Sequence, residues 1–263
     1  MRVLITGCST GIGRAAAIEL ARRGHDVVAT ARRRETLDDL DVAARLVLDV
    51  DQDDSVARAV AAAGPIDALV NNAGWSARGP VEKVPLEAVR RMFETNFFGT
   101  ARMIQALLPG MRARGGGVIV NLSSLAGRVA PPLSGFYAAS KFALEGLSET
   151  LRYEIGHFGI RVVLIEPGYI GTDFGEHGSH HGLDAAPYDE LHRIWSGSDG
   201  KLVGGVRPGP EGVAVAISDA VEAKEPKLRW PVGGDAELVT KARAAMDDEK
   251  FEAAMRAMLK LDW

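Results

Sequence analysis

Short runs of branched apolar residues recur along the chain, and longer segments with apolar positions at helical spacing separate them. The apolar runs predict strands at residues 3–5, 26–30, 45–48, 68–70, 118–120 and 162–165. Several runs show no polar alternation, as expected of strands that are covered on both faces. The longer segments predict helices at 12–23, 53–63, 86–114 and 136–157. This alternation indicates an α/β fold, a doubly wound parallel sheet in a single domain that spans residues 1–263.

The stretch 171–210 is the least regular part of the chain. It is rich in Gly, His, Asp and Pro, and it carries Tyr188, Leu191 and Trp195 at helical spacing. A long irregular segment in a compact domain is usually a functional loop or a disordered one. We therefore predict a substrate-binding lid at about 171–210, whose aromatic residues either face an apolar substrate or pack in the core. The remaining pattern predicts a helix at 213–221, a strand at 228–232 and helical residues from 236 onward.

The composition is that of an ordinary globular protein. Of the 263 residues, 46% are hydrophobic and 25% are charged, and the net charge of -4 gives no basic field of the kind that attracts nucleic acid. The single Cys8 excludes an intrachain disulfide and fits a reducing compartment. No apolar run approaches the length of a membrane span, and the N-terminus enters a strand without a leader. We expect a cytoplasmic protein without a membrane span.

A glycine-rich turn joins the first predicted strand to the first predicted helix. It reads Thr6-Gly7-Cys8-Ser9-Thr10-Gly11-Ile12-Gly13. Glycines let the backbone approach a pyrophosphate, and the helix N-terminus supplies N–H donors and a positive dipole. We predict cofactor contacts from Gly7, Ser9, Gly11 and Ile12, although a tight turn without a ligand is the alternative. Cys8 is either a packing residue or a redox-sensitive thiol.

The end of the second strand bears on the choice of cofactor. Dinucleotide-binding folds place an acidic residue there to bind the ribose 2′-hydroxyl, whereas this chain has Arg32-Arg33-Arg34. An arginine can bind a 2′-phosphate through charge-assisted bonds. Arg32, helped by Arg33 or Arg14, therefore favours NADP(H) as the cofactor, and NAD(H) is the alternative. A reading without any bound phosphate also exists, in which these arginines are a basic run at the solvated start of a helix.

Two further strand ends carry candidate cofactor contacts. Asp49 and Val50 follow the third strand, where Asp49 either accepts a hydrogen bond from an adenine amino group or caps the next helix. Asn72, Ala73 and Gly74 follow the fourth strand. A glycine there permits close approach of backbone to cofactor, or else belongs to an ordinary turn. Trp75 comes next and is a candidate for the border of the substrate pocket.

Tyr137 and Lys141 lie four residues apart in a predicted helix, so that they share one face. A tyrosine ordinarily titrates near a pKa of about 10. A neighbouring cation lowers that pKa, and the tyrosine can then exchange a proton with an alcohol or carbonyl oxygen. The same spacing occurs by chance on solvated helices, so its meaning depends on the cofactor motif.

Together these motifs resemble the short-chain dehydrogenase/reductase family. The matching residues, in family order up to about residue 172, are Thr6-Gly7-x-x-x-Gly11-Ile12-Gly13, Asn71-Asn72-Ala73-Gly74, Asn96, Ser123-Ser124, Tyr137-x-x-x-Lys141 and Pro167-Gly168. The helix around Tyr137 and the C-terminal part are similar to the hydroxysteroid and retinol dehydrogenase branch. The resemblance implies a Rossmann fold. It also implies a homodimer or homotetramer that pairs through the helix of Tyr137 and the next one.

The resemblance assigns roles to particular residues. It implies that Ser124, rather than Ser123, binds the substrate oxygen and that Tyr137 exchanges the proton. Lys141 would bind the nicotinamide ribose and lower the pKa of Tyr137, and Asn96 would hold a water in a proton relay. A second group would lie against the nicotinamide: Pro167, Gly168, Ile170 and Thr172.

The sequence thus predicts an NADP-dependent oxidoreductase that interconverts an alcohol and a ketone or aldehyde by hydride transfer, with an apolar small molecule as substrate. The alternatives are an NAD-preferring dehydrogenase of the same family and a cofactor-sensing protein without catalysis. The run Glu176-His177-Gly178-Ser179-His180-His181 contains metal-ligand types, but its spacing is not that of a closed zinc site. We expect a solvated loop there, with a substrate-contacting histidine as the second reading, and no metal.

Overall fold

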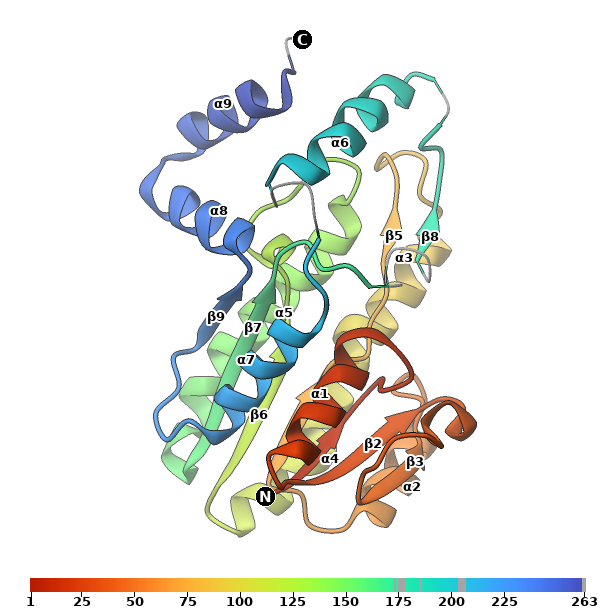
Figure 1. Ribbon diagram of the computed structural model, residues 1–263, viewed down its shortest axis with the longest axis vertical. Helices are drawn as coiled ribbons and strands as arrows, with labels where there is room; N and C mark the ends of the chain where they lie inside the picture. Colours follow the sequence, from red (N-terminus) through yellow and green to blue (C-terminus); the bar gives the residue numbers. More distant parts are fainter. Residues whose placement is uncertain (173, 175–177, 185, 203–206, 262–263) are drawn as a thin grey trace.

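The computed structural model describes residues 1–261, apart from 173, 175–177, 185 and 203–206 (Figure 1). A seven-stranded sheet forms its centre, in the order β3-β2-β1-β4-β6-β7-β9, and every neighbouring pair is parallel. The strands are β1 (Arg2–Ile5), β2 (Asp26–Ala31), β3 (Ala44–Val47), β4 (Ala68–Asn71), β6 (Gly117–Leu122), β7 (Ile160–Pro167) and β9 (Arg229–Val232). The chain builds outward from β1 to β3, then crosses to β4 and builds the other way. Ligands bind at such a reversal, beyond the carboxyl ends of the strands.

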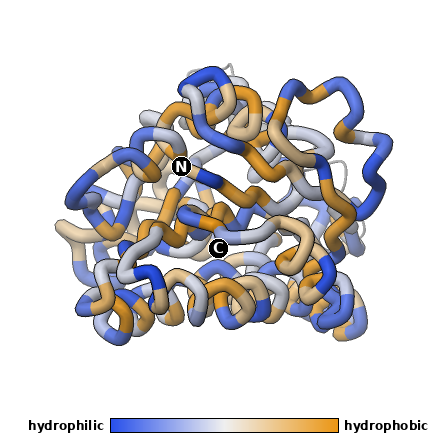
Figure 2. The backbone as a smooth tube through the Cα atoms, turned by 90° about the horizontal axis from the view of Figure 1, so that it is seen from below, coloured by the Kyte–Doolittle hydropathy of each residue, from blue (hydrophilic) through white to orange (hydrophobic). Residues whose placement is uncertain are grey.

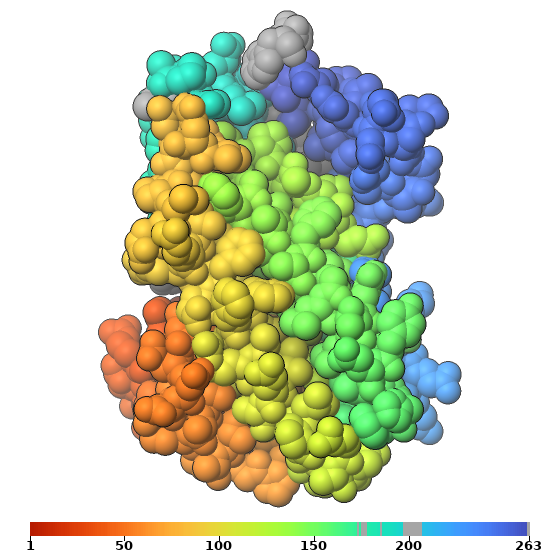
Figure 3. Space-filling view, turned by 180° about the vertical axis from the view of Figure 1, so that it is seen from behind, coloured from red at the N-terminus to blue at the C-terminus, as the bar shows by residue number. Residues whose placement is uncertain are grey.

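Helices cover both faces of the sheet. The helices of the chain are α1 (Gly11–Arg22), α2 (Asp53–Ala63), α3 (Leu86–Phe93), α4 (Thr100–Ala113), α5 (Gly135–Ile155), α6 (Asp189–Leu202), α7 (Glu211–Glu222), α8 (Gly234–Ala245) and α9 (Asp248–Leu259). One core layer lies between the sheet and α1 and α7, and the other lies between the sheet and α2, α4 and α5. Figure 2 shows these layers end-on, with apolar segments of the sheet between the helices. Figure 3 shows α2, α4 and α5 side by side on the rear face.

The side-chain alternation of the strands explains the two core layers. Val3 and Ile5 point to the α1 and α7 side, whereas Leu4 between them packs on the opposite side. All three side chains are fully buried. Because helices cover both faces of the sheet, these strands carry an apolar residue at every position, which explains the unbroken apolar runs in the sequence. The predicted doubly wound sheet is confirmed.

The predicted long helix 86–114 is interrupted in the structure. Between α3 and α4 the backbone forms a π-helical turn at Glu94–Gly99. Such turns are rare and often lie at functional sites. A Cβ atom at Gly99 would lie 2.7 Å from Cγ2 of Val50, so the small residue lets this turn pack closely on the end of β3. The turn carries Asn96 and buries it.

The segment predicted as an irregular lid contains regular structure. Strand β8 (Ser179–His180) pairs in parallel with β5 (Ala77–Arg78), and α6 follows it. Two-residue strands leave no pattern in a sequence, which is why both were missed. Helices α6, α8 and α9 lie beyond the carboxyl ends of the sheet strands (Figure 1). Across the described ranges, no helix combines the length and the apolar composition that crossing a bilayer requires.

Candidate active site

A cavity of 1420 Å³ opens at the carboxyl ends of the strands, where the sheet reverses direction. It runs from the glycine turn after β1 to the helices α8 and α9. Every residue predicted to bind cofactor or to act in catalysis lines this cavity, with the exception of Asn96. Residues from the ends of six strands and from helix α5 thus meet around one space, as expected of parallel strands whose carboxyl ends share an edge.

The glycine turn forms a cradle that side chains would fill. Gly7 and Gly11 have φ angles of 75° and 57°, in the left-handed region that favours glycine. A Cβ atom at Gly13 would lie 2.3 Å from both the carbonyl oxygen of Gly7 and Nδ2 of Asn72. Thr10, at the N-cap of α1, makes no side-chain cap. The first N–H groups of α1 are therefore open to an anion, and the turn fits a pyrophosphate.

Asn72 and Thr6 fasten the cradle to the neighbouring strand. The Asn72 side chain donates to the carbonyl oxygens of Thr6 and Gly7 at 2.9 and 3.0 Å. Oγ1 of Thr6 accepts from the backbone N–H groups of Asn72 and Ala73, both at 3.0 Å. These bonds hold the ends of β1 and β4 together. They keep residues 72–74 beside the glycine turn, where we predict their cofactor contacts.

Arg32 lies at the nucleotide end of the cavity and is exposed. Its two predicted helpers are engaged elsewhere: Arg14 bonds Asp39 and the carbonyl oxygen of Thr36, and Arg33 lies 3.8 Å from Glu35. Neither helper lines the cavity. Of the three arginines, Arg32 is the one that lines the cavity.

Asp49 shapes the turn that precedes α2. Its Oδ1 accepts from the N–H of Asp51 at 3.1 Å, and its own N–H donates to Ser55 at 2.9 Å. The N-cap of α2 is Gln52, so the alternative of a helix cap for Asp49 does not hold. Asp49 and the buried Val50 both line the cavity, where they can face an adenine.

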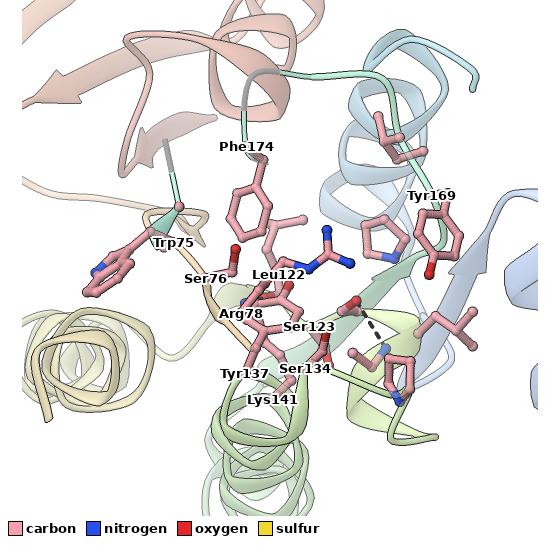
Figure 4. A pocket seen from close by; sticks show the side chains of 18 of the residues that line it. Trp75, Ser76, Arg78, Leu122, Ser123, Ser134, Tyr137, Lys141, Tyr169 and Phe174 are labelled. Carbon is pink, nitrogen blue, oxygen red and sulfur yellow. Dashed lines mark hydrogen bonds between the residues drawn. The ribbon is translucent and has the colours of Figure 1, made fainter. Parts of the chain in front are cut away.

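Tyr137, Lys141 and Ser124 all line the cavity, and Figure 4 shows Tyr137 and Lys141 on α5 within it. The hydroxyl of Ser124 is a hydrogen-bond partner of Tyr137 and also accepts from the N–H of Ala126 at 3.1 Å. Nζ of Lys141 lies 5.8 Å from the centroid of the Tyr137 ring and donates to the carbonyl oxygen of Leu122 at 2.7 Å. A Cβ atom at Gly127 would lie 2.6 Å from Oγ of Ser123, so that hydroxyl packs against the Gly127 backbone, although Ser123 also lines the cavity.

The pKa values of this pair depart from our expectation. Burial raises the pKa of Tyr137 to about 12, and the hydrogen bond with Ser124 and the charge of Arg78 offset only part of that increase. Burial also lowers the pKa of Lys141 to about 8, with Glu145 acting in the opposite direction. The expected lowering of the Tyr137 pKa by Lys141 is therefore absent from the protein alone. Removal from water disfavours the charged form of each side chain, and neither side chain is among the causes that shift the other's pKa.

Asn96 lies behind the cavity wall, where it holds the chain after β4. It is 1% exposed. Its Oδ1 accepts from the N–H of Trp75 at 3.0 Å, and its Nδ2 donates to the carbonyl oxygen of Trp75 at 2.9 Å and to Ser140 at 3.1 Å. Ser140 in turn donates to the carbonyl oxygen of Tyr137 at 2.7 Å. Asn96 thereby links the fourth strand end to the first turn of α5.

The loop after β7 is held by α8. The N–H of Tyr169 donates to Oδ2 of Asp235 at 2.7 Å, and a Cβ atom at Gly168 would lie 2.1 Å from Oδ1 of the same residue. Thr172 lies across the mouth from Gly11, with 3.6 Å between its Cβ and a Cβ atom built on the glycine. The predicted contacts Pro167, Gly168, Ile170 and Thr172 therefore flank the cradle.

The structure describes part of the predicted lid. Trp195 is 3% exposed, packs with Leu133 and Leu259, and borders the cavity, so the core-packing alternative describes it best. His180 and His181 line the cavity, whereas Glu176 and His177 lie outside the described residues. In the part of the chain that the structure describes, no three His, Cys, Asp or Glu side chains form a metal-binding group.

Cys8 is fully buried and its thiol lies 3.3 Å from the carbonyl oxygen of Ile5. Burial raises the pKa of this thiol to about 12, which keeps it protonated and unreactive. The packing alternative is the one that the structure supports.

Several cavity residues gave no signal in the sequence. They are Ser76 and Arg78 around β5, Tyr169 and Phe174 in the loop after β7, and Val239, Phe251, Met255 and Leu259 from the last two helices. The rings of Phe174 and Tyr137 lie 5.7 Å apart between their centroids. These residues form the substrate end of the cavity and come from segments without a motif.

Comparison with known proteins agrees with this geometry. The sequence model of the short chain dehydrogenase family matches residues 1–181. The chain is 37% identical to retinol dehydrogenase 8 of Homo sapiens over 247 residues, which covers 86% of this chain and 79% of that protein. It is 35% identical to 3-ketodihydrosphingosine reductase of Bacteroides thetaiotaomicron, over 97% of this chain and 96% of that protein.

Solved structures show the same fold. A short-chain dehydrogenase from Streptomyces avermitilis superposes with a TM-score of 0.84 at 35% identity, covering 100% of this chain and 99% of that one. A short chain dehydrogenase from Burkholderia cenocepacia, in complex with NADP, superposes with a TM-score of 0.78 at 28% identity and covers 98% and 96%. The chain therefore belongs to the short-chain dehydrogenase/reductase family, nicotinamide-dependent oxidoreductases that act on alcohol and carbonyl groups.

Proposed function

We propose that this protein is an NADP(H)-dependent oxidoreductase that interconverts a large apolar alcohol and its ketone or aldehyde. One observation carries the proposal: the hydrogen-bonded pair of Ser124 and Tyr137 lies between a phosphate cradle and an apolar chamber in one continuous cavity. This arrangement gives a substrate oxygen a proton donor on one side and a cofactor site on the other.

The residues divide the chemistry between them. The nicotinamide cofactor, when held by the glycine turn and by the loop 167–172, supplies or accepts the hydride. In reduction, the hydroxyl of Ser124 donates a hydrogen bond to the carbonyl oxygen and stabilises the charge that develops there. Tyr137 then gives its proton to that oxygen. In oxidation the same atoms act in reverse, and Tyr137 accepts the proton.

Lys141 and Asn96 support the proton transfer. Below a pH of about 8 the buried Lys141 side chain is an ammonium ion, and its charge favours the phenolate form of Tyr137 during the reaction. We propose that Lys141 also binds the nicotinamide ribose and that Asn96 holds a water that returns protons to the site. The placement of Asn96 one layer behind Tyr137, through Ser140, supports that role.

A panel of ketones, aldehydes and alcohols with NADPH and NADP⁺ tests the reaction. We expect Tyr137→Phe to lose turnover by at least about a hundred-fold, because a general acid–base contributes roughly 10²–10⁴ in rate, while NADPH affinity stays within about twofold. Tyr153→Phe, on the exposed end of α5, is the matched control and should retain full activity. Tight NADPH binding without turnover of any panel member would instead favour the cofactor-sensing alternative.

Arg32 supports the preference for NADP(H) over NAD(H). Arg32 makes no ion pair within the described residues, although its charge acts on the Asp51 carboxylate in the same cavity. Its guanidinium is therefore available for a 2′-phosphate. We expect Arg32→Asp to lower the ratio of kcat/KM for NADPH to that for NADH by about 10²-fold or more, since charge-assisted hydrogen bonds are each worth roughly 1.5–3 kcal/mol. Arg33→Asp makes the same charge change one residue away and should leave the ratio unchanged. An unchanged ratio in Arg32→Asp would contradict this assignment.

The walls of the chamber support an apolar substrate. They include Trp75, Leu125, Val129, Phe174, Trp195, Met255 and Leu259. Two relatives carry the names of retinol and 3-ketodihydrosphingosine, which recommends lipid-like ketones and alcohols as the first members of the panel.

Assembly and location are further parts of the proposal. We propose a homodimer or homotetramer that pairs through α5, which carries Tyr137, and the next helix, because Phe142 and Tyr153 are exposed on α5. Light scattering should then give a multiple of the 28.0 kDa chain mass, and a 28.0 kDa species alone would contradict it. The buried, protonated thiol of Cys8 is compatible with the cytoplasm, which cell fractionation tests.

A further inference from the structure

A cationic side chain at the substrate end of the cavity has no role in the mechanism above. Arg78 ends the short strand β5, and the pairing of β5 with β8 fixes its backbone. Its carbonyl oxygen accepts from the N–H of His181 at 2.9 Å. Figure 4 shows the Arg78 side chain within the pocket, in the neighbourhood of Tyr137, Ser123 and Phe174.

Arg78 has no carboxylate partner among the residues that the structure describes. The other arginines around the substrate end are neutralised or stacked. Arg128 lies 3.2 Å from Glu166, Arg243 pairs with Asp248, and Arg256 lies 2.8 Å from Glu252. Arg91 lies 5.8 Å from the centroid of the Trp75 ring, and Arg207 lies 5.6 Å from that of Tyr169. A half-buried guanidinium among apolar walls is costly without a partner. The partner of Arg78 is therefore to be sought in the ligand.

A second polar group without a partner lies beside it. Ser76 is 2% exposed and lines the same cavity, and its buried Oγ makes no hydrogen bond within the described part of the chain. Ser76 comes directly before β5 and Arg78 ends it, and both residues line the cavity. Figure 4 shows both side chains in the pocket. A hydroxyl and a guanidinium together match the two oxygens of a carboxylate.

The position of this pair relates it to the reacting carbon. Figure 4 shows Arg78 in the same part of the pocket as Tyr137, and the charge of Arg78 acts on the Tyr137 phenol. An oxygen bound at Arg78 would accordingly belong to the same substrate molecule whose carbonyl Tyr137 protonates. The described carboxylates that line the cavity do not lie beside Arg78. Asp49 and Asp51 lie at the nucleotide end, and Asp248 and Glu252 lie on α9.

We propose that Arg78 and Ser76 bind a carboxylate of the substrate, so that the enzyme prefers apolar keto acids, and the corresponding hydroxy acids, over neutral ketones of the same size. This proposal rests on the proposed function and names its substrate class. The two residues determine specificity, whereas Ser124 and Tyr137 act on the reacting oxygen of any substrate.

The kinetic test compares a long-chain keto acid with its methyl ester. We expect the wild-type enzyme to prefer the acid by roughly 10- to 100-fold in kcat/KM, since hydrogen bonds to charged groups are of this strength. Arg78→Met should remove that preference through a higher KM for the acid and leave the ester unchanged. Ser76→Ala should reduce it by about 3- to 10-fold, and Arg78→Lys should keep part of it. Arg90→Met, an equal charge change on the exposed side of α3, is the control and should keep the full preference.

Two outcomes would overturn the proposal. If Arg78→Met slows the acid and the ester equally through kcat, Arg78 acts on Tyr137 and recognises no carboxylate. If wild type does not distinguish acid from ester, no carboxylate site exists there.

A binding experiment separates this proposal from the reaction itself. Dodecanoate and dodecanamide, which carry no ketone, are titrated calorimetrically into the NADPH-bound protein. If wild type binds dodecanoate more tightly than dodecanamide and Arg78→Met does not, the carboxylate site is supported even if no ketone is turned over. Equal binding of the two compounds to wild type contradicts the proposal.

Discussion

The Asn96 side chain offers the sharpest test of how the site is held together. Its amide makes three hydrogen bonds, two of which go to the backbone of Trp75 and one to Ser140. Asn96→Leu preserves the approximate volume but removes all three. Ser140 keeps its bond to the carbonyl oxygen of Tyr137, so two backbone groups of Trp75 lose their partner. Each buried group without a partner costs about 1–3 kcal/mol.

Because Trp75 is only half-buried, water can reach it in part, and we expect a loss of about 2–4 kcal/mol in the free energy of unfolding. For a chain of this size that loss corresponds to a fall in Tm of roughly 5–15 °C. Urea unfolding followed by circular dichroism measures the free energy. Amide hydrogen exchange at Trp75 provides a local readout, because its N–H loses the Asn96 oxygen and should exchange far faster.

Thr100→Val serves as the control, since Thr100 donates one hydrogen bond to the backbone carbonyl of Asn96 at 3.1 Å. We expect it to cost about 1 kcal/mol and to leave the protection of the Trp75 amide intact. A loss below about 1 kcal/mol in Asn96→Leu, with unchanged exchange at Trp75, would refute the view that this amide organises the strand end.

Three further predictions concern stability. The pKa of Lys141 is about 8 in the folded protein against an ordinary 10.5, so between these pH values the unfolded chain binds an extra proton and stability rises with pH. At pH 7 the full cost of burying the charged amine applies, which is about 3 kcal/mol. Lys141→Met should therefore raise the free energy of unfolding at pH 7 by about 1–2 kcal/mol, after the lost hydrogen bond to Leu122 is counted, while activity is abolished. Burial and the charge of Glu145 raise the pKa of Glu166 to about 7. Between pH values of about 4.5 and 7 the folded state therefore holds an extra proton, and the protein loses stability as the pH rises through that window. Urea titrations at several pH values should show this fall in the wild-type protein and a flatter pH dependence of stability in Glu166→Gln. Gly13→Ala should prevent NADPH binding, measured by fluorescence, and lower Tm, because its Cβ atom would lie 2.3 Å from backbone; retained affinity would show that the cradle is softer than its contacts indicate.

The sheet and the nucleotide cradle could be predicted because their signals are local. Unbroken apolar runs mark strands that are buried on both sides, and the spacing of Gly7, Gly11 and Gly13 reports a turn whose conformation those residues alone determine. The bounds of α2 agree with the predicted 53–63 for the same reason.

The substrate end could not be predicted, since it depends on contacts between distant segments. The pairing of Arg78 with His180 joins residues about a hundred positions apart, through strands too short to leave a periodic pattern. Helix α6 has the helical spacing of Leu191 and Trp195, yet the glycines and prolines around it made the whole segment look irregular. The raised pKa of Tyr137 is likewise a property of tertiary burial that the four-residue spacing to Lys141 does not contain.

The contact between Asp235 and the loop after β7 has a consequence for how substrate range can evolve. The family match ends at residue 181, whereas α8 and α9 supply the far wall of the cavity. Insertions or replacements in these last helices can reshape the chamber while the nucleotide cradle stays intact, provided that one carboxylate remains to accept from the N–H of Tyr169. Asp235 thus ties the loop beside the nucleotide cradle to the C-terminal helices that wall the chamber.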